Sequence, residues 1–492
     1  MLHGSSLNFT DIRNWINVWL LQRTIISILF LLLFQPVFGQ EQVGLRMGNY
    51  AGSWSTAINP ANSAYFSGKW DIGIGSFGFF VDNDILYLKE TSVQKASIHS
   101  NKIRLFSNEK NAIEAEKGSI IGIYNVGKIS NFGQILARVD GPSFLYKVNQ
   151  NYTFGLSSST RVNIGFQNLP RDLSSSQFDN FASIKSQSLP QLKGSAMVWS
   201  EIAPNVSYHS TGDYDFSIGI TPKLLIGHES AYLKSEDLAI KLGMDSSLYY
   251  AGNLNFGFTH ANLTSQEVGL KVSGWGGGLD VGFVFGAQEF TKSEIPKYKW
   301  RAGFAMLDLG FISYHKKASK YELPLDESQR AGSIENGEPK TVNSLTTFKE
   351  RFINDTAQMH GYTIFTPAAL SAHFDYHIVS DLYMGILMIQ KIPLGANALK
   401  RPSSLILSSR FERKWYSIGT SLSLVNWKNM QLGMSAKLGF LYFGTENLMA
   451  LAFNKKRLYS TDFYVGMKIN DFTFGSKRKD RNKTKKVKCP TF

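Results

Sequence analysis

The sequence predicts an all-β protein: a transmembrane antiparallel β-barrel of about 14 strands with an N-terminal plug-like segment. Segments that alternate apolar with small or polar residues recur along the chain, and a period of two places the two sets on opposite sides of a sheet. The composition agrees, with 43% hydrophobic residues, 13% aromatic residues and 43 glycines among 492 residues. Such strands suit lipid on one side and water or a plug on the other, whereas a bundle of membrane helices would be more hydrophobic.

Residues 1–39 have the pattern of an export signal. Two arginines precede the apolar run 25–34, which is too short to span a bilayer. Val37 and Gly39 are small enough for the −3 and −1 positions of a cleavage site, which leaves Gln40 as the new first residue. No cysteine follows the apolar run, so a lipoprotein signal is not expected. An uncleaved anchor helix is the alternative.

Residues 40–68 lack a strand pattern and form the predicted plug. The segment is rich in turn residues, and Asn59-Pro60 is a strong chain breaker. It also carries aromatic residues such as Trp54, and burial of these side chains is favourable. We therefore expect the segment to pack inside the barrel, with Asn59 and Pro60 turning the chain into the first strand.

Residues 69–475 are predicted to form the barrel. The clearest alternation is interpreted as one strand that runs from Met430 to Tyr442 with all its large apolar residues on one face. The other clear segments begin with the strand at Trp70 and continue at 152–157, 161–166, 214–221, 254–259, 279–286, 416–424 and 462–470. Weaker segments lie near 118–126, 195–209, 300–311, 368–378, 381–391 and 403–412. The lipid-facing set is predicted to include Phe283, Leu432, Leu438 and Val465.

Tryptophans at strand ends suit the aromatic girdles of a membrane barrel, although core aromatics of a soluble protein would give the same pattern. These residues are Trp70, Trp199, Trp300, Trp415 and Trp427. Two polar insertions, 171–193 and 315–358, interrupt the strand rhythm and are predicted as long loops on the outer face.

The formal net charge of +14 is concentrated at the C-terminus. The segment 476–492 carries eight lysines and arginines between Lys477 and Lys488, and we predict a disordered, solvated tail. An anchor to anionic lipid headgroups or to cell-wall polymer is the alternative. Because the charge is not spread over a domain, nucleic-acid binding is not predicted. The single cysteine, Cys489, excludes a disulfide within one chain and a site with several thiolate ligands.

Three polar residues are candidates for the barrel interior because they share one strand face. His373, Asp375 and His377 alternate with Phe374, Tyr376 and Ile378, which should meet lipid. Their spacing would hold a metal ion if a third partner approached, but polar lining of the lumen is the favoured interpretation. No metal or cofactor is therefore predicted.

Two carboxylates, Asp280 and Asp308, lie within strands among small residues. A buried carboxylate needs a partner, and Arg161, Arg301 or Lys437 would serve. A structural lattice of ion pairs is favoured over acid–base chemistry. No G-x-S-x-G nucleophile motif occurs, and the G-x-G-x-x-G at 73–78 lies in a strand with no helix after it, so an enzyme is not predicted.

Several short blocks resemble known barrel families. Asn59-Pro60-Ala61-Asn62 resembles the Asn-Pro-Ala motif of fatty-acid-transporter-like barrels and their secretion-associated Bacteroidetes relatives. The further blocks 141–144, 273–276, 279–282 and 307–311 resemble an uncharacterised Bacteroidetes outer-membrane barrel family, labelled a domain of unknown function. The resemblance covers about 41–470. It implies a barrel with an N-terminal plug, behind which the fatty-acid-transporter relatives bind hydrophobic ligands.

Two function classes follow for an outer-membrane protein of a Gram-negative bacterium. The first is passage or binding of small hydrophobic molecules. The second is an envelope interaction scaffold, such as a component of secretion or gliding motility. The expected partners are outer-membrane lipid and the barrel-assembly machinery, with a small hydrophobic ligand or an envelope protein according to the class. The candidate plug and lumen residues are Trp54, Asn59, Pro60, Asp280, Asp308, His373, Asp375 and His377.

Overall fold

A computed structural model describes residues 41–471 apart from 107–108, 110–111, 113–117, 125–129, 171–186, 189–190, 211–214, 243–247, 260–269, 290–296, 326–329, 336–337, 342–357 and 396–397. The predicted export signal and the predicted basic tail at 476–492 lie outside these residues, as does most of the insertion 171–193. In the described part of the chain, no helix is both long and apolar enough to cross a membrane.

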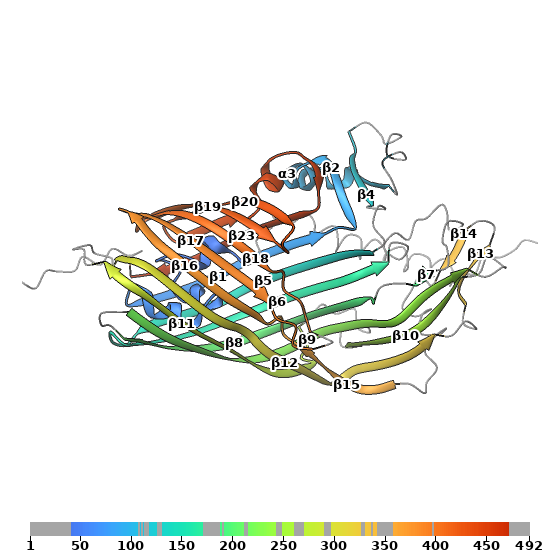
Figure 1. Ribbon diagram of the computed structural model, residues 1–492, viewed down its shortest axis with the longest axis horizontal. Helices are drawn as coiled ribbons and strands as arrows, with labels where there is room; N and C mark the ends of the chain where they lie inside the picture. The colour runs from blue at the N-terminus through green and yellow to red at the C-terminus, as the bar shows by residue number, and fades with distance from the viewer. Residues whose placement is uncertain are drawn as a thin grey trace, which may run out of the picture.

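Fourteen described strands close into an antiparallel barrel, which confirms the predicted fold class (Figure 1). The ring closes because β1 pairs with β23 on one side and with β5 on the other. In order around the ring, the strands are β1 (Trp70–Asn83), β5 (Ser130–Lys147), β6 (Tyr152–Pro170), β8 (Lys193–Ser210), β9 (Asp215–Leu242), β11 (Gly274–Glu289), β12 (Lys297–Leu325), β16 (Ala369–Val379), β17 (Leu382–Lys391), β18 (Ser404–Glu412), β19 (Tyr416–Val425), β20 (Asn429–Leu438), β21 (Leu441–Thr445) and β23 (Ser460–Asn470).

One end of the barrel extends well beyond the other (Figure 1). Strands β9 and β12 continue past the ring, where β10 (Leu248–Thr259) pairs with both and β15 (Gln358–Phe365) pairs with β12. The hairpin β13 (Arg330–Glu335) and β14 (Glu338–Thr341) and the short strand β7 (Gln187–Ser188) complete this extended end. At the opposite, short end, tight turns such as 148–151, 380–381 and 439–440 join the strands.

The outer surface of the ring carries the apolar half of each strand, as predicted. The side chains of Phe283, Leu432, Leu438 and Val465 are 43%, 45%, 56% and 37% exposed. Alternate residues on the same strands point into the lumen and are buried, for example Asp280, which is 2% exposed. The period of two therefore separates a lipid-facing surface from a polar interior.

Some predicted element boundaries were wrong because a turn or an extension was hidden in the pattern. The segments 152–157 and 161–166, predicted separately, are one strand, β6. The segment from Met430 to Tyr442 is a hairpin: Leu438 pairs with Leu441 across a turn in which Gly439 has φ +60°, so Tyr442 is buried rather than lipid-facing. The segment 315–358, predicted as a loop, begins as strand, because β12 continues to Leu325.

Trp199 contradicts the girdle prediction. It lies in the middle of β8 and is 1% exposed, with the Arg161 guanidinium 4.8 Å from its ring centroid. Trp415 and Trp427 do lie in exposed positions beside turns, where the rings are about half exposed. The difference arises because Trp199 occupies one of the positions of β8 whose side chains point into the barrel, whereas Trp415 and Trp427 lie outside the strands.

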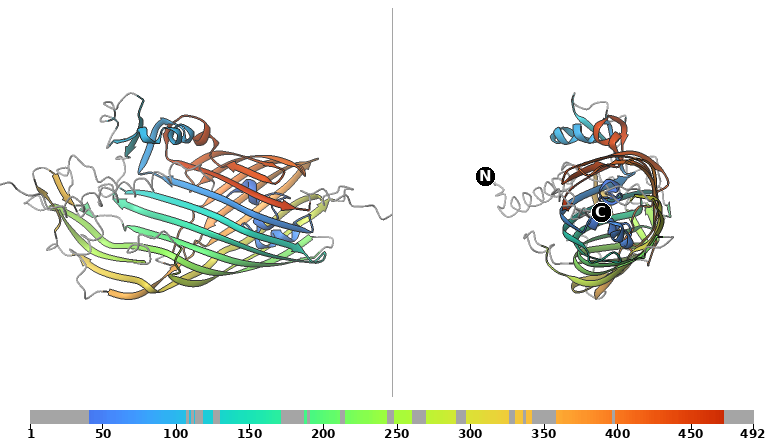
Figure 2. Two further views of the ribbon diagram at one scale, coloured as in Figure 1. Left: turned by 180° about the vertical axis from the view of Figure 1, so that it is seen from behind. Right: turned by 90° about the vertical axis from the view of Figure 1, so that its left-hand side faces the viewer.

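A second, four-stranded sheet lies outside the barrel, and the sequence analysis did not predict it (Figure 2). It consists of β22 (Lys455–Leu458), β2 (Leu86–Thr91), β4 (Ile120–Tyr124) and β3 (Ile103–Phe106). The helices α3 (Val93–Ile98) and α6 (Leu448–Ala452) and the 3-10 turn η3 (Ser100–Lys102) accompany it. The weak strand predicted near 118–126 therefore belongs to this outer sheet rather than to the barrel.

Candidate functional site: a plugged and charged lumen

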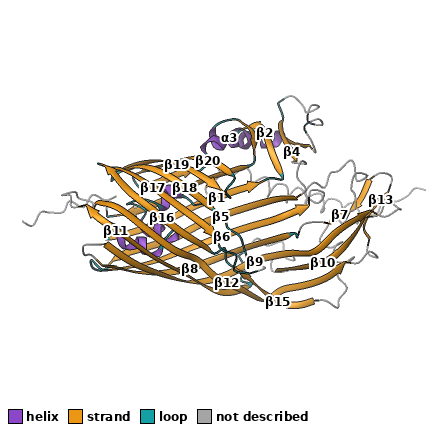
Figure 3. Cartoon of the chain, viewed as in Figure 1, coloured by secondary structure: helices purple, strands orange, loops and turns teal. Residues whose placement is uncertain are grey.

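Residues 41–66 lie inside the ring of strands and form the plug (Figure 2, right). The plug contains α2 (Val43–Arg46) and two 3-10 helices, η1 (Gly52–Ala57) and η2 (Pro60–Tyr65), which Figure 3 shows as helices surrounded by strands. Val43 and Ile58 pack against wall residues such as Leu387 and Ile406 in one buried apolar cluster. The plug therefore has an apolar contact with the wall, but most of its contacts are polar.

Asn59 and Pro60 hold the plug to the wall rather than turning the chain into β1. The Asn59 side chain caps η2 by accepting a hydrogen bond from the Ala61 amide at 3.0 Å. Its amide nitrogen donates to the carbonyl oxygens of Phe283 and Phe304 at 3.1 and 3.2 Å. Asn59 is thus bound on both sides, to its own helix and to the barrel.

Wall glycines make room for this contact. A Cβ atom at Gly282 would overlap the Asn59 side chain, and a Cβ atom at Gly219 would overlap the backbone of Pro60 and Ala61. Since close approach of two backbones needs residues without a Cβ, the glycines of β9 and β11 and the Asn-Pro-Ala turn of the plug fit each other.

Side chains of the wall bind the rest of the plug backbone. Glu446 accepts from the Val43 amide at 3.0 Å, and the Tyr464 hydroxyl accepts from the Gly44 amide at 3.0 Å. The Asn49 amide and side chain both donate to Glu412, at 3.1 and 2.9 Å. These bonds satisfy backbone groups that a buried segment without regular structure would otherwise leave unpaired.

Two serines of the plug form further bonds to the wall. The amide and hydroxyl of Ser53 donate to Asp71 at 2.8 and 2.7 Å. The Ser63 hydroxyl lies 2.7 Å from the Asn205 amide oxygen and 2.8 Å from the Ser207 hydroxyl. The plug is therefore bound by β1, β8, β18 and β23 as well as by β11 and β12, on several sides of the lumen.

Trp54 fills the space between the plug and β21. It is 4% exposed, its ring meets the Tyr442 ring edge-on at 5.5 Å, and the Lys468 ammonium lies 4.3 Å from its centroid. Its indole nitrogen is buried without a hydrogen-bond partner among the described residues. Trp54 thus contributes packing and a cation–π contact at this position.

A continuous chain of ion pairs joins the plug to the wall. Asp140 contacts Arg46 at 3.7 Å and also Arg138, whose guanidinium contacts Glu201 at 3.3 Å. Arg161 links Glu201 to the next carboxylate, at 3.4 and 2.8 Å. The described members are the five cations Arg46, Arg138, Arg161, Lys223 and Arg401 and the five carboxylates Glu41, Asp140, Glu201, Asp280 and Asp308. Five charges of each sign leave the ion-pair chain neutral.

Asp308 is the branch point of this chain. Arg161 donates to its two oxygens at 2.8 and 3.0 Å, Lys223 lies at 2.7 Å and Arg401 at 3.7 Å. Lys223 also contacts Asp280 at 2.7 Å. Of the three partners proposed for these two carboxylates from the sequence, only Arg161 is among the described contacts.

The other two proposed partners serve different sites. Arg301 lies 3.8 Å from Asp375, and the Lys437 ammonium lies 3.6 Å from the centroid of the Tyr50 ring. Both residues nevertheless contact the plug, because Arg301 donates to the Asn49 side chain at 3.2 Å and Tyr50 is itself a plug residue.

His373, Asp375 and His377 point inward from β16, but they do not converge on one point. Both Asp375 oxygens accept from Arg410 at 2.8 Å, and His377 lies 2.8 Å from the Ser380 carbonyl oxygen. The Nδ1 atom of His373 is buried without a described partner. Within the described residues, no group of three or more His, Cys, Asp or Glu side chains is arranged to hold a metal ion.

The link between β17 and β18 folds into the lumen instead of leaving the barrel. We call residues 392–395 and 398–403 the inward loop. Leu399 is buried, and its amide donates to the Phe365 carbonyl oxygen at 3.1 Å. The Lys400 carbonyl accepts from Gln134 and Asn163, and Arg401 binds both oxygens of Glu41 in the plug. The inward loop therefore joins the wall to the first described residue of the plug.

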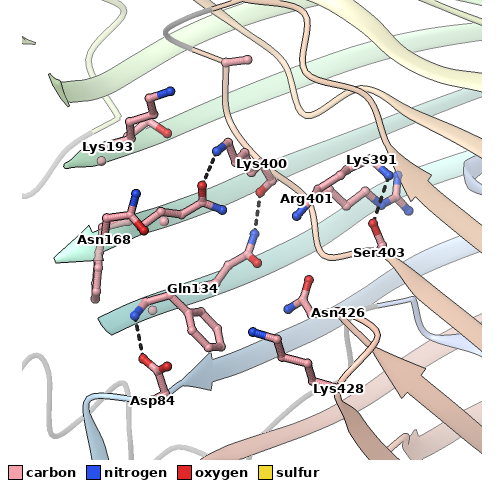
Figure 4. A pocket seen from close by; sticks show the side chains of 18 of the residues that line it. Asp84, Gln134, Asn168, Lys193, Lys391, Lys400, Arg401, Ser403, Asn426 and Lys428 are labelled. Atoms are coloured by element: carbon pink, nitrogen blue, oxygen red, sulfur yellow. Dashed lines mark hydrogen bonds between the residues drawn. The ribbon is translucent and has the colours of Figure 1, made fainter. Parts of the chain in front are cut away.

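Cavities remain between these elements and the wall. A cavity of about 480 Å³, the mouth cavity, is lined by the inward loop, by the ends of β5, β6 and β8 that lie toward the extended end, and by the turn 426–429 (Figure 4). A central cavity of about 70 Å³ lies along the ion-pair chain, and a third of about 40 Å³ lies between the plug and His373.

Comparison of the sequence with known families shows the family to which the chain belongs. Residues 60–446 match a family of unknown function, DUF5723. The chain belongs to this family. The barrel family of unknown function predicted from the sequence blocks is thereby confirmed. No curated protein matches the chain in sequence.

Three solved barrels illustrate the structures to which this DUF5723 chain is similar. The toluene transporter TbuX of Ralstonia pickettii is 10% identical over 88% of this chain and 98% of its own, with a TM-score of 0.41. The toluene transporter TodX of Pseudomonas putida is 10% identical over 89% and 97%, with a TM-score of 0.32. A FadL homologue of Pseudomonas aeruginosa is 12% identical over 88% and 98%, with a TM-score of 0.30.

Three of the blocks that suggested this family lie at irregularities of the wall. In β5, the register shifts between Asp140 and Ser143. In β11, it shifts between Leu279 and Val281, opposite Asp308, which has φ +54° and donates its amide to Asp280 at 2.6 Å. Because a β-bulge re-aims a side chain, the DUF5723 blocks place carboxylates of the ion-pair chain toward the lumen.

One anchor of the plug titrates near neutral pH. Burial, followed by the negative charge of Asp462, raises the pKa of Glu446 to about 8. The carboxyl group therefore holds its proton at pH 7 while its oxygens contact the Val43 amide and the Ser421 hydroxyl. Sequence reasoning missed Glu446, since it follows a short strand and no pattern marks it.

Proposed function

We propose that this protein is an outer-membrane channel that admits small molecules with hydrophobic parts, and that the plug of residues 41–66 opens and closes the lumen. In outer-membrane barrels, short turns face the periplasm and long extensions face outward. The mouth cavity then opens toward the outside, and the plug lies between it and the periplasm. Passage requires that the plug move, since it lies in the lumen and is bound to strands on several of its sides.

The observation that carries this proposal is the charge balance of the plug contact. The plug contributes one cation and one carboxylate to the ion-pair chain, Arg46 and Glu41. Without them, four cations and four carboxylates remain in the wall and the inward loop, so withdrawal of the plug leaves no net buried charge. Since an uncompensated buried charge is costly, this arrangement suits a plug that moves as a unit.

A reversible lock tests the proposal. The Ser63 and Ser207 hydroxyls lie 2.8 Å apart, so the pair Ser63→Cys and Ser207→Cys, made with Cys489→Ser, should form a disulfide between η2 and β8. We expect the oxidised lock to abolish entry of the dye N-phenyl-1-naphthylamine into intact cells that carry the protein in an outer membrane whose lipopolysaccharide otherwise excludes the dye. Reduction should restore entry to the level of the unmodified barrel.

A matched control separates plug motion from barrel rigidity. Thr160 and Ser200 also have hydroxyls 2.9 Å apart, but both lie in the wall, on β6 and β8. A disulfide between Thr160→Cys and Ser200→Cys should leave dye entry unchanged. Entry that is insensitive to the plug lock, or no entry in any form of the protein, would refute a channel gated by the plug.

The outer sheet favours a second function, an envelope scaffold. The helices that accompany it carry exposed apolar side chains, Ile98 of α3 at 69% and Phe453 at the end of α6 at 53%. Lys456 and Arg457 on β22 are exposed basic residues. A channel has no need of such a surface. A photo-crosslinking residue placed at Gln94 on α3 tests this function in cells: a specific adduct with an envelope protein supports the scaffold, and adducts with lipid alone oppose it.

A further inference from the structure

The mouth cavity is lined by an excess of positive charge. Four lysines reach it from four separate elements: Lys193 from β8, Lys391 from β17, Lys400 from the inward loop and Lys428 from the turn after β19 (Figure 4). Among the described residues that line the cavity, Asp84 is the one carboxylate, and it accepts a hydrogen bond from the Phe132 amide at 2.6 Å. The Arg401 guanidinium, which also lines the cavity, is bound to Glu41.

The lysines are close enough to repel one another. Burial lowers the pKa of Lys400, and the positive charges of Lys193 and Lys391 lower it further. The Lys400 ammonium donates to the Gln167 amide oxygen, which is neutral and does not offset its charge. A cluster of cations in a recess is stabilised by a bound anion, because the recess keeps water and salt from screening the attraction fully.

The same cavity has an apolar part. Phe132, Phe166 and Leu233 line it from the wall strands, and Trp427 lines it from the turn that carries Lys428. Gln134 and Ser403 add polar groups to this lining. A volume of about 480 Å³ lies in the range in which proteins hold small molecules, and an apolar lining with a few convergent polar groups is usual for such sites.

We propose that the mouth cavity binds small amphipathic anions, in which a carboxylate or phosphate head meets the lysines and an aromatic or short aliphatic body meets Phe132, Phe166 and Trp427. The ligand is a free solute, since the inward loop forms part of the site and lies in the lumen. The claim that such anions are transported rests on the proposed channel function. The claim that they bind in the mouth cavity does not.

Binding to the purified full-length barrel in detergent tests the inference. We expect 2-naphthoate and 2-naphthyl phosphate to bind in titration calorimetry, and the neutral isostere 2-naphthamide to bind more weakly. The triple variant Lys193→Gln, Lys391→Gln, Lys400→Gln should weaken binding of both anions about tenfold or more, since it removes three partly buried cations. Its affinity for 2-naphthamide should not change.

A charge-matched control excludes an effect of net charge. Lys95 on α3, Lys102 on η3 and Lys456 on β22 are exposed and do not line the cavity. Their triple change to Gln should leave naphthoate binding unaltered. The inference is overturned if no anion binds, if both triple variants act alike, or if the cavity variant loses the amide as much as the anions. Anion binding together with dye entry that ignores the plug lock would overturn the channel and leave this site standing.

Discussion

Replacement of Asp308 by Asn should destabilise the folded barrel by about 3–5 kcal/mol, the usual cost of breaking a buried ion pair. The substitution keeps the shape of the side chain and removes one negative charge. Arg161, Lys223 and Arg401 all contact this carboxylate, at 2.8, 2.7 and 3.7 Å. The ion-pair chain would then hold five cations and four carboxylates, so one positive charge stays buried without compensation.

The matched control is an exposed ion pair in the same barrel. Arg413 and Asp381 lie 3.0 Å apart, with side chains 56% and 31% exposed. Asp381→Asn should cost about 0–1 kcal/mol, because water screens both partners. Urea titration in lipid vesicles, read by the fraction of protein that keeps its folded gel mobility without heating, gives both free energies of unfolding.

A double variant tests whether the cost comes from charge. Arg161→Gln removes one cation next to Asp308, and Glu201 keeps its contact with Arg138 at 3.3 Å. Combined with Asp308→Asn, it returns the chain to neutrality and should recover part of the lost stability. The reasoning is refuted if Asp308→Asn costs no more than Asp381→Asn, or if the double variant loses the sum of the two single losses.

Three further predictions concern the wall and the plug. Leu422→Arg, in mid-strand on the lipid face, should lower the free energy of unfolding by about 2–4 kcal/mol, whereas Leu438→Arg, beside a turn, should lower it by about 0–1 kcal/mol. Equal losses of folded gel mobility in urea would disprove the assigned depths of the two residues in the membrane. Gly219→Val should displace the plug from the lumen, because its side chain would overlap the backbone of Pro60 and Ala61, and the plug should then be cleaved by protease. Gly277→Val should leave the plug protected, because no atom lies nearer than 4.0 Å to a Cβ at that position. Glu446 has a folded pKa of about 8, above its ordinary 4.5, so the free energy of unfolding should fall as pH rises through that window. Urea titrations at pH 5 and pH 9 should show this fall, and Glu446→Gln should remove it; an unchanged pH dependence in the variant would contradict the assignment.

The strand faces were predictable because they depend on local alternation alone. In β11, Phe283 is outward and Asp280 inward, and the phase of the pattern decides both without knowledge of any other strand. The alternation gave a wrong strand where the chain turns but the residue composition does not change. Gly439 and Phe440 read as two more strand residues, yet they form the turn of a hairpin and reverse the direction of the chain.

The partners of the lumen residues were not predictable. Asp308 meets Arg161, which is 147 residues away, because the curvature of the closed ring brings together inward side chains of β12 and β6, which are four places apart in the strand order. That geometry depends on strand number, register and bulges, none of which a single strand encodes. The inward loop was missed for the same reason: residues 392–403 resemble an ordinary connection, and only the closed barrel shows that Arg401 reaches Glu41.

The charge balance seen in the ion-pair chain recurs at other contacts of the plug. Asp71, which binds Ser53, has a wall cation of its own in Lys468 at 3.3 Å, and Glu412, which binds Asn49, has Arg410 at 2.9 Å.

Glu446 has a carboxylate neighbour instead, and there the raised pKa keeps the group neutral below about pH 8. At these contacts, the wall group that binds the plug is either paired within the wall or protonated. At Asp71, Glu412 and Glu446, departure of the plug therefore costs hydrogen bonds and apolar contacts but leaves no wall carboxylate with an isolated charge. A plug fixed permanently would not need this arrangement, because a wall charge could then be paired by the plug alone.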